Sequence, residues 1–293
     1  MALTGSAARG NARADSDLDL WVLGARSGRI TVNRSGTSIT LLCQRFDEAT
    51  TLDNLCFYEV DDLIVLRDPS GAFDRLKRIW NRRRPAIHRR IETATEEQLV
   101  WELERGSRGS LLHRAAFLRL ACWRMACLFV FLKRGWRVPR LHLLAEELPA
   151  ASSRRLDAVL GLPSAAVCRR FARQMPRAVR ELEAMLARDG KAVRLEVPES
   201  IAAKAGSAPK EAAFLARREL VLELLPVVFA RYGVTDLKGV ELLDRAPTAR
   251  AVLLGLEPKA SEKTVQALQQ HARALAKGLG LGQRSALEWF LKP

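Results

Sequence analysis

A glycine–serine pair and two closely spaced aspartates are the residues of this chain best suited to chemistry. Gly5 and Ser6 are followed, after ten residues, by Asp17 and Asp19, each of which precedes a leucine. On a β-strand side chains alternate between faces, so the two aspartates share one face and the leucines face the core. Two carboxylates whose Cα atoms lie about 6–7 Å apart can share a Mg²⁺ ion or help to hold two. The spacing therefore predicts a metal site on this strand.

The residues that precede the aspartates are suited to binding phosphate. A strand is predicted to end at Gly5 and a short helix to run over 7–12. Gly5 permits close backbone approach, and Ser6 offers a hydroxyl and an N–H group at the helix N-terminus, which attracts phosphate. Arg9 and Arg13 can add charge-assisted hydrogen bonds. The alternative is an ordinary turn followed by a polar loop whose aspartates act only as caps, but the D-S-D-L-D-L pattern at this spacing favours a phosphate and metal site.

These residues resemble the active-site signature of a known superfamily. Gly5-Ser6, ten residues and Asp17-Leu18-Asp19-Leu20 are similar to the signature of the DNA polymerase β-like nucleotidyltransferases, particularly the bacterial minimal and antibiotic-type members. The resemblance implies a small mixed sheet flanked by helices and Mg²⁺-dependent transfer of a nucleoside monophosphate from an NTP, with ATP expected, to an acceptor hydroxyl. It also implies that Asp17 and Asp19 are catalytic and bind the metal, and that Gly5 and Ser6 bind the triphosphate.

The chain departs from this family at the third carboxylate. Members carry it on a later strand, predicted here over 38–42, where the expected position holds Thr40. A hydroxyl cannot replace the charge of a carboxylate in binding metal or in acting as a general base. Glu59 and Asp61 are candidates for the missing acid if 58–66 is a strand, although surface acids are common. The sequence thus supports a nucleotide site more strongly than it supports turnover.

Composition indicates acidic partners. The 293 residues carry a formal net charge of +15, which favours nucleotides, RNA or DNA and argues against a cationic acceptor. An alanine-, leucine- and arginine-rich composition can also raise the charge without any nucleic-acid role. The five cysteines are scattered without a C-x-x-C pair, which predicts reduced thiols in a cytoplasmic protein without structural zinc.

The apolar stretch 115–132 contains two arginines and is predicted to be a core helix, so no membrane association is expected. No secretory signal is recognised, because the N-terminus leads directly into the phosphate turn.

The chain is predicted to have an α+β fold with three parts. Residues 1–95 form a nucleotidyltransferase domain with a small mixed β-sheet, 96–195 a helical domain, and 196–293 a helical C-terminal module of unknown role. Pro85 is expected to break the helix before it, with a new helix starting at Thr95. A linker is predicted over 202–210, where small residues, Gly and Pro gather.

Several basic segments have two interpretations. The run 75–90 interleaves arginines with Trp80 and is either an arm that tracks phosphates and stacks bases, or a solvated helix face with Trp80 packed inward. Four arginines on one predicted helix face within 164–188 allow the same two interpretations. Arg108 and His113 match the R-x4-H pattern of HEPN ribonucleases, which often accompany minimal nucleotidyltransferases, although chance matches are common in an arginine-rich chain.

Three functions remain open from the sequence. The first is a nucleotidyltransferase whose acceptor is RNA, a protein or a small molecule, with the basic charge favouring RNA or protein. The second is a nucleotide-binding regulator or antitoxin-like partner of a toxin that has lost turnover, suggested by Thr40. The third is a basic nucleic-acid-binding protein built on the same fold.

Overall fold

The computed structural model describes residues 1–10, 12, 16–34, 37–50, 60–135, 144, 146–196, 199–257 and 260–292. The chain divides into two compact units, Met1–Glu92 and Thr93–Pro293. The first unit carries a mixed sheet and the second is helical, so the predicted α+β class is confirmed. The further division of the helical part at residue 195 stays a prediction.

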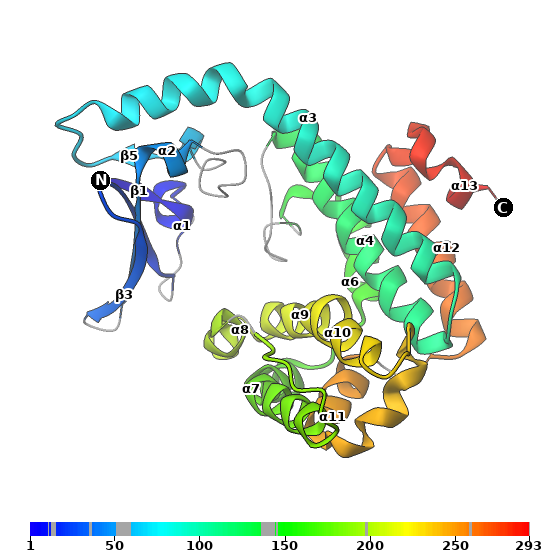
Figure 1. Cartoon of the computed structure of the whole chain (residues 1–293). Helices are drawn as coiled ribbons and strands as arrows, with labels where there is room; N and C mark the ends of the chain where they lie inside the picture. The colour runs from blue at the N-terminus through cyan, green and yellow to red at the C-terminus, as the bar shows by residue number, and fades with distance from the viewer. Residues whose placement is uncertain are drawn as a thin grey trace. The chain divides into compact units, whose positions relative to one another are not determined.

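Five strands form the sheet of the first unit (Figure 1). They are β1 (Ala2–Thr4), β2 (Leu18–Leu23), β3 (Gly28–Arg34), β4 (Thr37–Gln44) and β5 (Ile64–Val65). Their order is β3-β4-β2-β1-β5. Strands β2 and β4 are parallel and the other neighbours are antiparallel, which makes the sheet mixed.

The core of this unit lies on the face of the sheet that also carries Asp19. Ala2 pairs with Trp21 in the register of β1 and β2, and both side chains are buried. The Trp21 ring packs edge-on against Phe73, with 6.1 Å between ring centroids. Because Asp19 lies two residues from Trp21, alternation places it on the same face.

The prediction that the leucines beside the aspartates face the core is therefore wrong. Leu18 and Leu20 are only half-buried, whereas Trp21 is 1% exposed. The large ring of Trp21 removes more apolar surface from water, so its face is the one that packs against the helix.

Two short helices and one long helix accompany the sheet. Helix α1 (Gly5–Ala8) is a single turn, shorter than the predicted 7–12, and α2 covers Phe46–Ala49. Helix α3 (Ala72–Ser107) begins where Asp68 accepts hydrogen bonds from the N–H groups of Ala72 and Phe73 at 2.8 and 2.9 Å. With a third bond from the N–H of Asp74 at 3.4 Å, this carboxylate satisfies three of the four unpaired donors at the helix start.

The expected break at Pro85 and new helix at Thr95 are wrong, because α3 continues from Ala72 to Ser107 without interruption. A proline inside a helix costs about 3 kcal/mol. Trp80 and Ile87, on either side of Pro85, are both buried in the core of the first unit, and their burial offsets this cost.

The second unit is built from helices around one hydrophobic core (Figure 1). In addition to the end of α3 it contains α4 (Leu111–Arg134), α6 (Ala150–Leu160), α7 (Ala165–Arg188), α8 (Glu199–Lys204), α9 (Pro209–Glu219), the π-helix η2 (Leu220–Leu224), α10 (Leu225–Ala230), the 3₁₀ helix η3 (Leu237–Arg245), α11 (Pro247–Leu256), α12 (Glu262–Gly278), the 3₁₀ turns η4 (Leu281–Gln283) and η5 (Ser285–Leu287), and α13 (Glu288–Leu291). Helix α4 packs against α6 and α12, and α7 packs against α9 and α11. The linker predicted over 202–210 is only partly correct, since α8 and α9 enter it from both ends.

Helix α4 is long and apolar enough to cross a membrane by length and composition, the one such helix in the part of the chain that the structure describes. Of its most apolar stretch, 78% is buried inside the protein, as expected for a core helix.

Two buried arginines share one buried glutamate in the core of this unit. Glu257 lies 2.5 Å from Arg119 Nη1 and 2.9 Å from Arg217 Nε, and the three side chains are at most 4% exposed. The arginines also donate to backbone carbonyls, Arg119 to Val159 at 3.2 Å and Arg217 to Leu160 at 2.6 Å. Charges removed from water in this way need their partners, because an unpaired buried charge is very costly.

A second polar cluster joins the end of α7 to η3. The Asp189 carboxylate receives both ends of the Arg245 guanidinium group at 2.7 and 2.8 Å, and the Tyr232 hydroxyl at 2.7 Å. The hydrogen bonds from Arg245, followed by that from Tyr232, lower the pKa of Asp189.

Candidate functional site

The turn between β1 and α1 brings Gly5 against Asp19. Gly5 has φ +69°, a left-handed conformation that favours glycine. A Cβ atom built on Gly5 would lie 2.7 Å from Asp19 Oδ2. The predicted close approach at this glycine is thus made, within the protein, by the carboxylate of Asp19.

Asp19 belongs to a row of polar side chains that crosses four strands. In the register of the sheet it pairs with Thr4 on one side and Thr40 on the other, and Thr40 pairs with Thr31. The hydroxyl oxygens of Thr31 and Thr40 lie 3.4 Å apart. Paired residues project to the same face, so these oxygens line one side of the Asp19 carboxylate.

Sequence reasoning missed Thr4 and Thr31 in this row, because strand register cannot be read from β1 and β3 alone. It identified Thr40 through the resemblance, and the parallel pairing of β2 and β4 places Thr40 directly beside Asp19. The side chain is 5% exposed. A threonine hydroxyl therefore occupies the position where the resemblance implies a carboxylate.

Asp17 lies one residue before β2 and is exposed. The two aspartates are separated by one residue, so an extended chain places their Cα atoms about 6–7 Å apart. Among the residues that the structure describes, no cluster of three or more His, Cys, Asp or Glu side chains could hold a metal ion. The candidate metal site thus rests on two carboxylates with neighbouring hydroxyl groups.

The phosphate-binding residues are placed differently from the prediction. Ser6 is 5% exposed and lies in the single-turn helix α1, so the support expected from a longer helix is lost. Arg9 ends this turn and pairs with Asp62 through Nη1 at 3.5 Å. Its Nε atom is buried without a hydrogen-bond partner among the described residues. Arg13 lies outside the described residues.

The acids considered as a third carboxylate do not gather around Asp19. Asp61 accepts a hydrogen bond from Trp80 Nε1 at 2.7 Å and pairs with Arg84 at 3.2 Å. Glu59 lies outside the described residues. Asp61 is therefore held by the start of α3, and its two partners account for its position.

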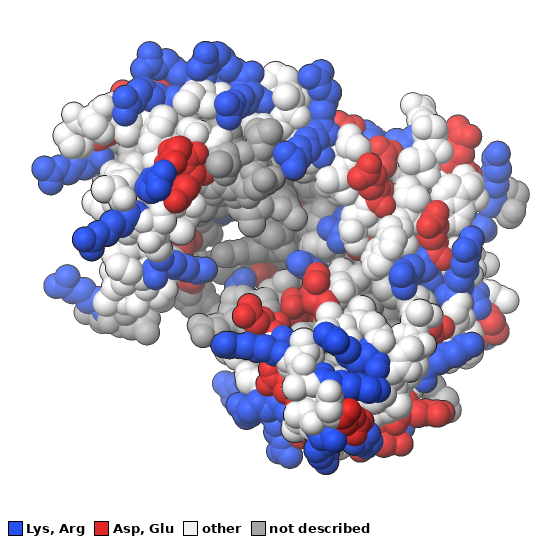
Figure 2. All heavy atoms as spheres, in the orientation of Figure 1, with Lys and Arg blue, Asp and Glu red and all other residues white. Residues whose placement is uncertain are grey.

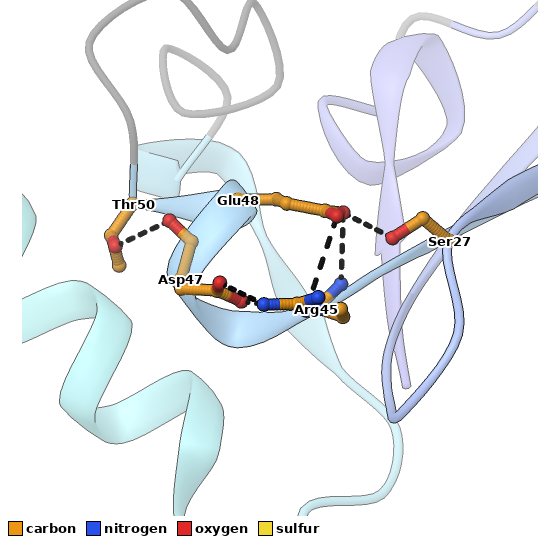
Figure 3. Close-up of polar contacts among 5 residues, drawn as sticks. All are labelled: Ser27, Arg45, Asp47, Glu48 and Thr50. Atoms are coloured by element: carbon orange, nitrogen blue, oxygen red, sulfur yellow. Dashed lines mark hydrogen bonds and ion pairs between the residues drawn. The ribbon is translucent and has the colours of Figure 1, made fainter.

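Two further acids of this unit form a local network at the start of α2 (Figure 3). The Glu48 carboxylate receives hydrogen bonds from the Ser27 hydroxyl and from the Arg45 backbone N–H. The Arg45 guanidinium group pairs with Asp47, and this hydrogen bond lowers the pKa of Asp47. Thr50 donates to the Asp47 backbone carbonyl at 3.0 Å. The network explains both acids as parts of the α2 start.

The basic run on α3 forms an exposed surface without a stacking aromatic ring. Figure 2 shows Lys and Arg side chains gathered over this part of the chain. Trp80 is 2% exposed and donates to Asp61, so the structure does not support the interpretation in which its ring stacks on bases. Arg84 pairs with Asp61, and Arg83 donates to the Thr50 carbonyl at 3.0 Å. The alternative interpretation, a helix face with Trp80 packed inward, agrees with the structure.

In the second unit, the two residues of the R-x4-H pattern meet at one cavity. Arg108 and His113 both line a hollow of about 380 Å³ at the junction of α3 and α4. The four basic residues predicted on one face of α7 are exposed: Arg169, Arg173, Arg177 and Arg180.

Comparison with protein-family models, with curated protein sequences and with solved structures gives no significant match for this chain. The class that the fold defines is an α+β protein, and its candidate site lies where a carboxylate-bearing strand meets a glycine turn.

Proposed function

We propose that the chain is a Mg²⁺-dependent nucleotidyltransferase that transfers a nucleoside monophosphate from an NTP, with ATP expected, to an acceptor hydroxyl of RNA or a protein. The observation that carries the proposal is the position of the Asp19 carboxylate against the left-handed Gly5 turn, with Asp17 two residues before it. The net charge of +15 supports an acidic acceptor. The scattered cysteines support a cytoplasmic location.

The donor chemistry of the site suits magnesium. Asp17 and Asp19 offer carboxylate oxygens, and the hydroxyl of Thr40 lies in the row beside them, all of which are oxygen ligands of the kind that Mg²⁺ prefers. When bound, the ion would neutralise charge on the triphosphate. Asp17 and Asp19 would hold it.

Arg9 supports a bound phosphate group. Its Nε atom is buried and lacks a partner among the described residues, and burying a polar group without a hydrogen bond is costly. A phosphate oxygen next to α1 would satisfy this donor by a charge-assisted hydrogen bond. Ser6 would add its hydroxyl from the same turn.

The test is transfer of label from α-labelled ATP in the presence of Mg²⁺, with RNA and total protein offered as acceptors. We expect Asp17→Asn and Asp19→Asn each to abolish transfer. Asp47→Asn is the matched control, because this acid is exposed, lies in the same unit and is explained by Arg45. Transfer that survives in both site variants would refute the proposal.

A second function is favoured by Thr40. Because a hydroxyl occupies the position beside Asp19, the chain can bind an NTP without transferring it, as a nucleotide-responsive regulator or antitoxin-like partner. ATP binding that depends on Asp19, without pyrophosphate release for any NTP, would support this function and exclude the first.

A further inference from the structure

The helical unit contains a two-part cavity that the proposed nucleotide chemistry does not use. An inner part of about 240 Å³ is lined by apolar side chains of α4, η2 and α10, among them Phe117, Val221 and Phe229. The outer part, of about 380 Å³, is lined by polar groups at the end of α3 and just after it, including Arg105 and Arg108. The two parts share His113 and Asp236 in their walls, so an apolar interior opens next to a polar mouth.

The backbone around the cavity has an uncommon form. Leu220–Leu224 is a π-helix, and its residues Val221 and Leu222 line the inner part. Such π-helical turns are rare and are often found at functional sites. The irregular turn thus coincides with the apolar wall of the cavity.

His113 is buried where the two parts meet, and one of its two ring nitrogens has no hydrogen-bond partner among the described residues. The residue is 6% exposed, and its Nδ1 atom is buried without a hydrogen-bond partner among the described residues. Burial lowers the pKa of His113, so the ring is neutral at pH 7. A neutral ring has one donor and one acceptor, and an unsatisfied buried nitrogen calls for an explanation such as a bound group.

The wall beside His113 is held rigidly. Asp236 accepts hydrogen bonds from the backbone N–H and the hydroxyl of Ser110, both at 2.7 Å, and from the Lys238 N–H at 2.6 Å. Gly109 has φ +91°, and a Cβ there would lie 2.6 Å from Asp236 Oδ2 and 3.1 Å from His113 Cδ2. Three donors occupy the Asp236 carboxylate, so it is a structural part of the wall.

The two arginines at the mouth are placed to receive an anion. The Arg105 guanidinium group stacks over Trp101 at 4.7 Å from the ring centroid and lies 5.8 Å from that of Phe117. Neither Arg105 nor Arg108 has an ion-pair partner among the described residues. Glu104 also lines the mouth, but it is exposed to solvent. The contact with the Trp101 ring holds the Arg105 guanidinium group at this wall, and a guanidinium group is well suited to bind a carboxylate.

We propose that this cavity binds a small amphipathic anion, an aryl- or alkyl-carboxylate whose apolar body enters between Phe117, Val221 and Phe229 and whose carboxylate meets Arg105 and Arg108. At about 30 Å³ for each water-sized group, the inner part accepts a body of about eight such groups. This site belongs to the helical unit and does not depend on nucleotide transfer.

The test compares two probes of equal shape on the full chain, 4-phenylbutyrate and the neutral 4-phenylbutanol, by calorimetry. We expect the carboxylate to bind at least tenfold more tightly than the alcohol. Arg105→Gln should remove this preference by weakening carboxylate binding at least tenfold more than alcohol binding. Arg218→Gln is the matched control, since Arg218 also lies over a tryptophan ring, that of Trp123 at 5.8 Å, and does not line this cavity. Equal affinity for the two probes, or a preference that survives Arg105→Gln, would overturn the proposal.

Two further measurements keep the test decisive. Ala230 is exposed and lines the inner part, so Ala230→Trp should block binding of both probes while circular dichroism and thermal unfolding remain those of the parent chain. The ring nitrogen resonances of His113 should shift on addition of 4-phenylbutyrate, and those of the exposed His271 should not. A folded protein that binds neither probe, or binding that persists in Ala230→Trp, refutes the site.

Discussion

Comparison of Gly5→Ala with Gly10→Ala separates the effect of backbone strain from the effect of displacing the Asp19 carboxylate. Both Gly5 and Gly10 have left-handed φ angles, +69° and +70°. An L-residue in this conformation costs about 1–2 kcal/mol, so both Gly5→Ala and Gly10→Ala should lower the free energy of unfolding by about that amount. The two sites differ in one respect, because a Cβ at Gly10 meets nothing within 4 Å, whereas a Cβ at Gly5 meets Asp19 Oδ2 at 2.7 Å.

The extra contact determines the expected difference. Cβ atoms essentially never approach another heavy atom within 3.0 Å, so the carboxylate at the end of the Asp19 side chain must shift away from the new methyl group. Magnesium demands near-ideal octahedral geometry, and a displaced ligand weakens it. We expect Gly5→Ala to weaken Mg·ATP binding about tenfold, or about 1.4 kcal/mol, and Gly10→Ala to leave it within about twofold.

Two assays distinguish the contributions. Urea unfolding followed by circular dichroism measures the loss of stability, which should be larger for Gly5→Ala than for Gly10→Ala. Titration calorimetry with Mg·ATP measures the second effect. If both variants weaken nucleotide binding alike, or if the two lose the same stability, the contact between Gly5 and Asp19 does not control the site and the argument fails.

Three other predictions follow from buried or paired acids. Thr40→Asp should lower the free energy of unfolding by about 1–3 kcal/mol in EDTA, because it buries a second carboxylate beside Asp19. Addition of Mg²⁺ should restore the lost stability, which thermal unfolding with and without Mg²⁺ measures. A loss of stability that Mg²⁺ does not reverse would count against a metal site. Glu257→Gln should lower the free energy of unfolding by about 3–5 kcal/mol in urea unfolding, since it leaves two buried arginines without their counter-charge. The surface control Glu262→Gln should lower it by about 1 kcal/mol or less. Similar losses for the two variants would contradict this prediction. Because the pKa of Asp189 is lowered in the folded protein, its stabilising contribution is complete above the unfolded pKa near 4 and is lost as the pH falls below that value. Measured as the free energy of unfolding against pH, the stability of Asp189→Asn should therefore fall less steeply at acid pH than that of the parent chain. Equal acid-side slopes for the two proteins would show that the carboxylate contributes nothing.

Local signals predicted much of the sheet and two of the long helices, α4 and α7. The alternating stretches 30–32 and 37–43 lie in the paired strands β3 and β4, and the apolar stripe over 111–134 gave the bounds of α4. Helix α3 was predicted less well, because the helix-breaking tendency of Pro85 was judged from the local sequence alone. The burial of Trp80 and Ile87, which holds the helix together across Pro85, depends on contacts with the sheet.

The candidate site, too, was predicted only in part. The resemblance assigned Gly5 and Asp19 to one candidate site, and the two residues lie against each other in the structure. The partners of Asp61 did not follow from its position in the sequence, because Trp80 and Arg84 come from the next helix. The hydroxyl row beside Asp19 depends on strand register, which requires the folded sheet.

The two arginines inside α4 have a consequence during protein synthesis. As an isolated segment, Leu111–Arg134 has the length and hydropathy that a translocon recognises as a membrane span. An arginine near the middle of such a segment costs about 2.5–3.5 kcal/mol on insertion, so Arg119 and Arg124 oppose delivery of the nascent chain to a bilayer. After folding, Glu257 and Glu102 neutralise them. The same two side chains thus oppose membrane insertion of the isolated segment and form ion pairs in the core of the folded chain.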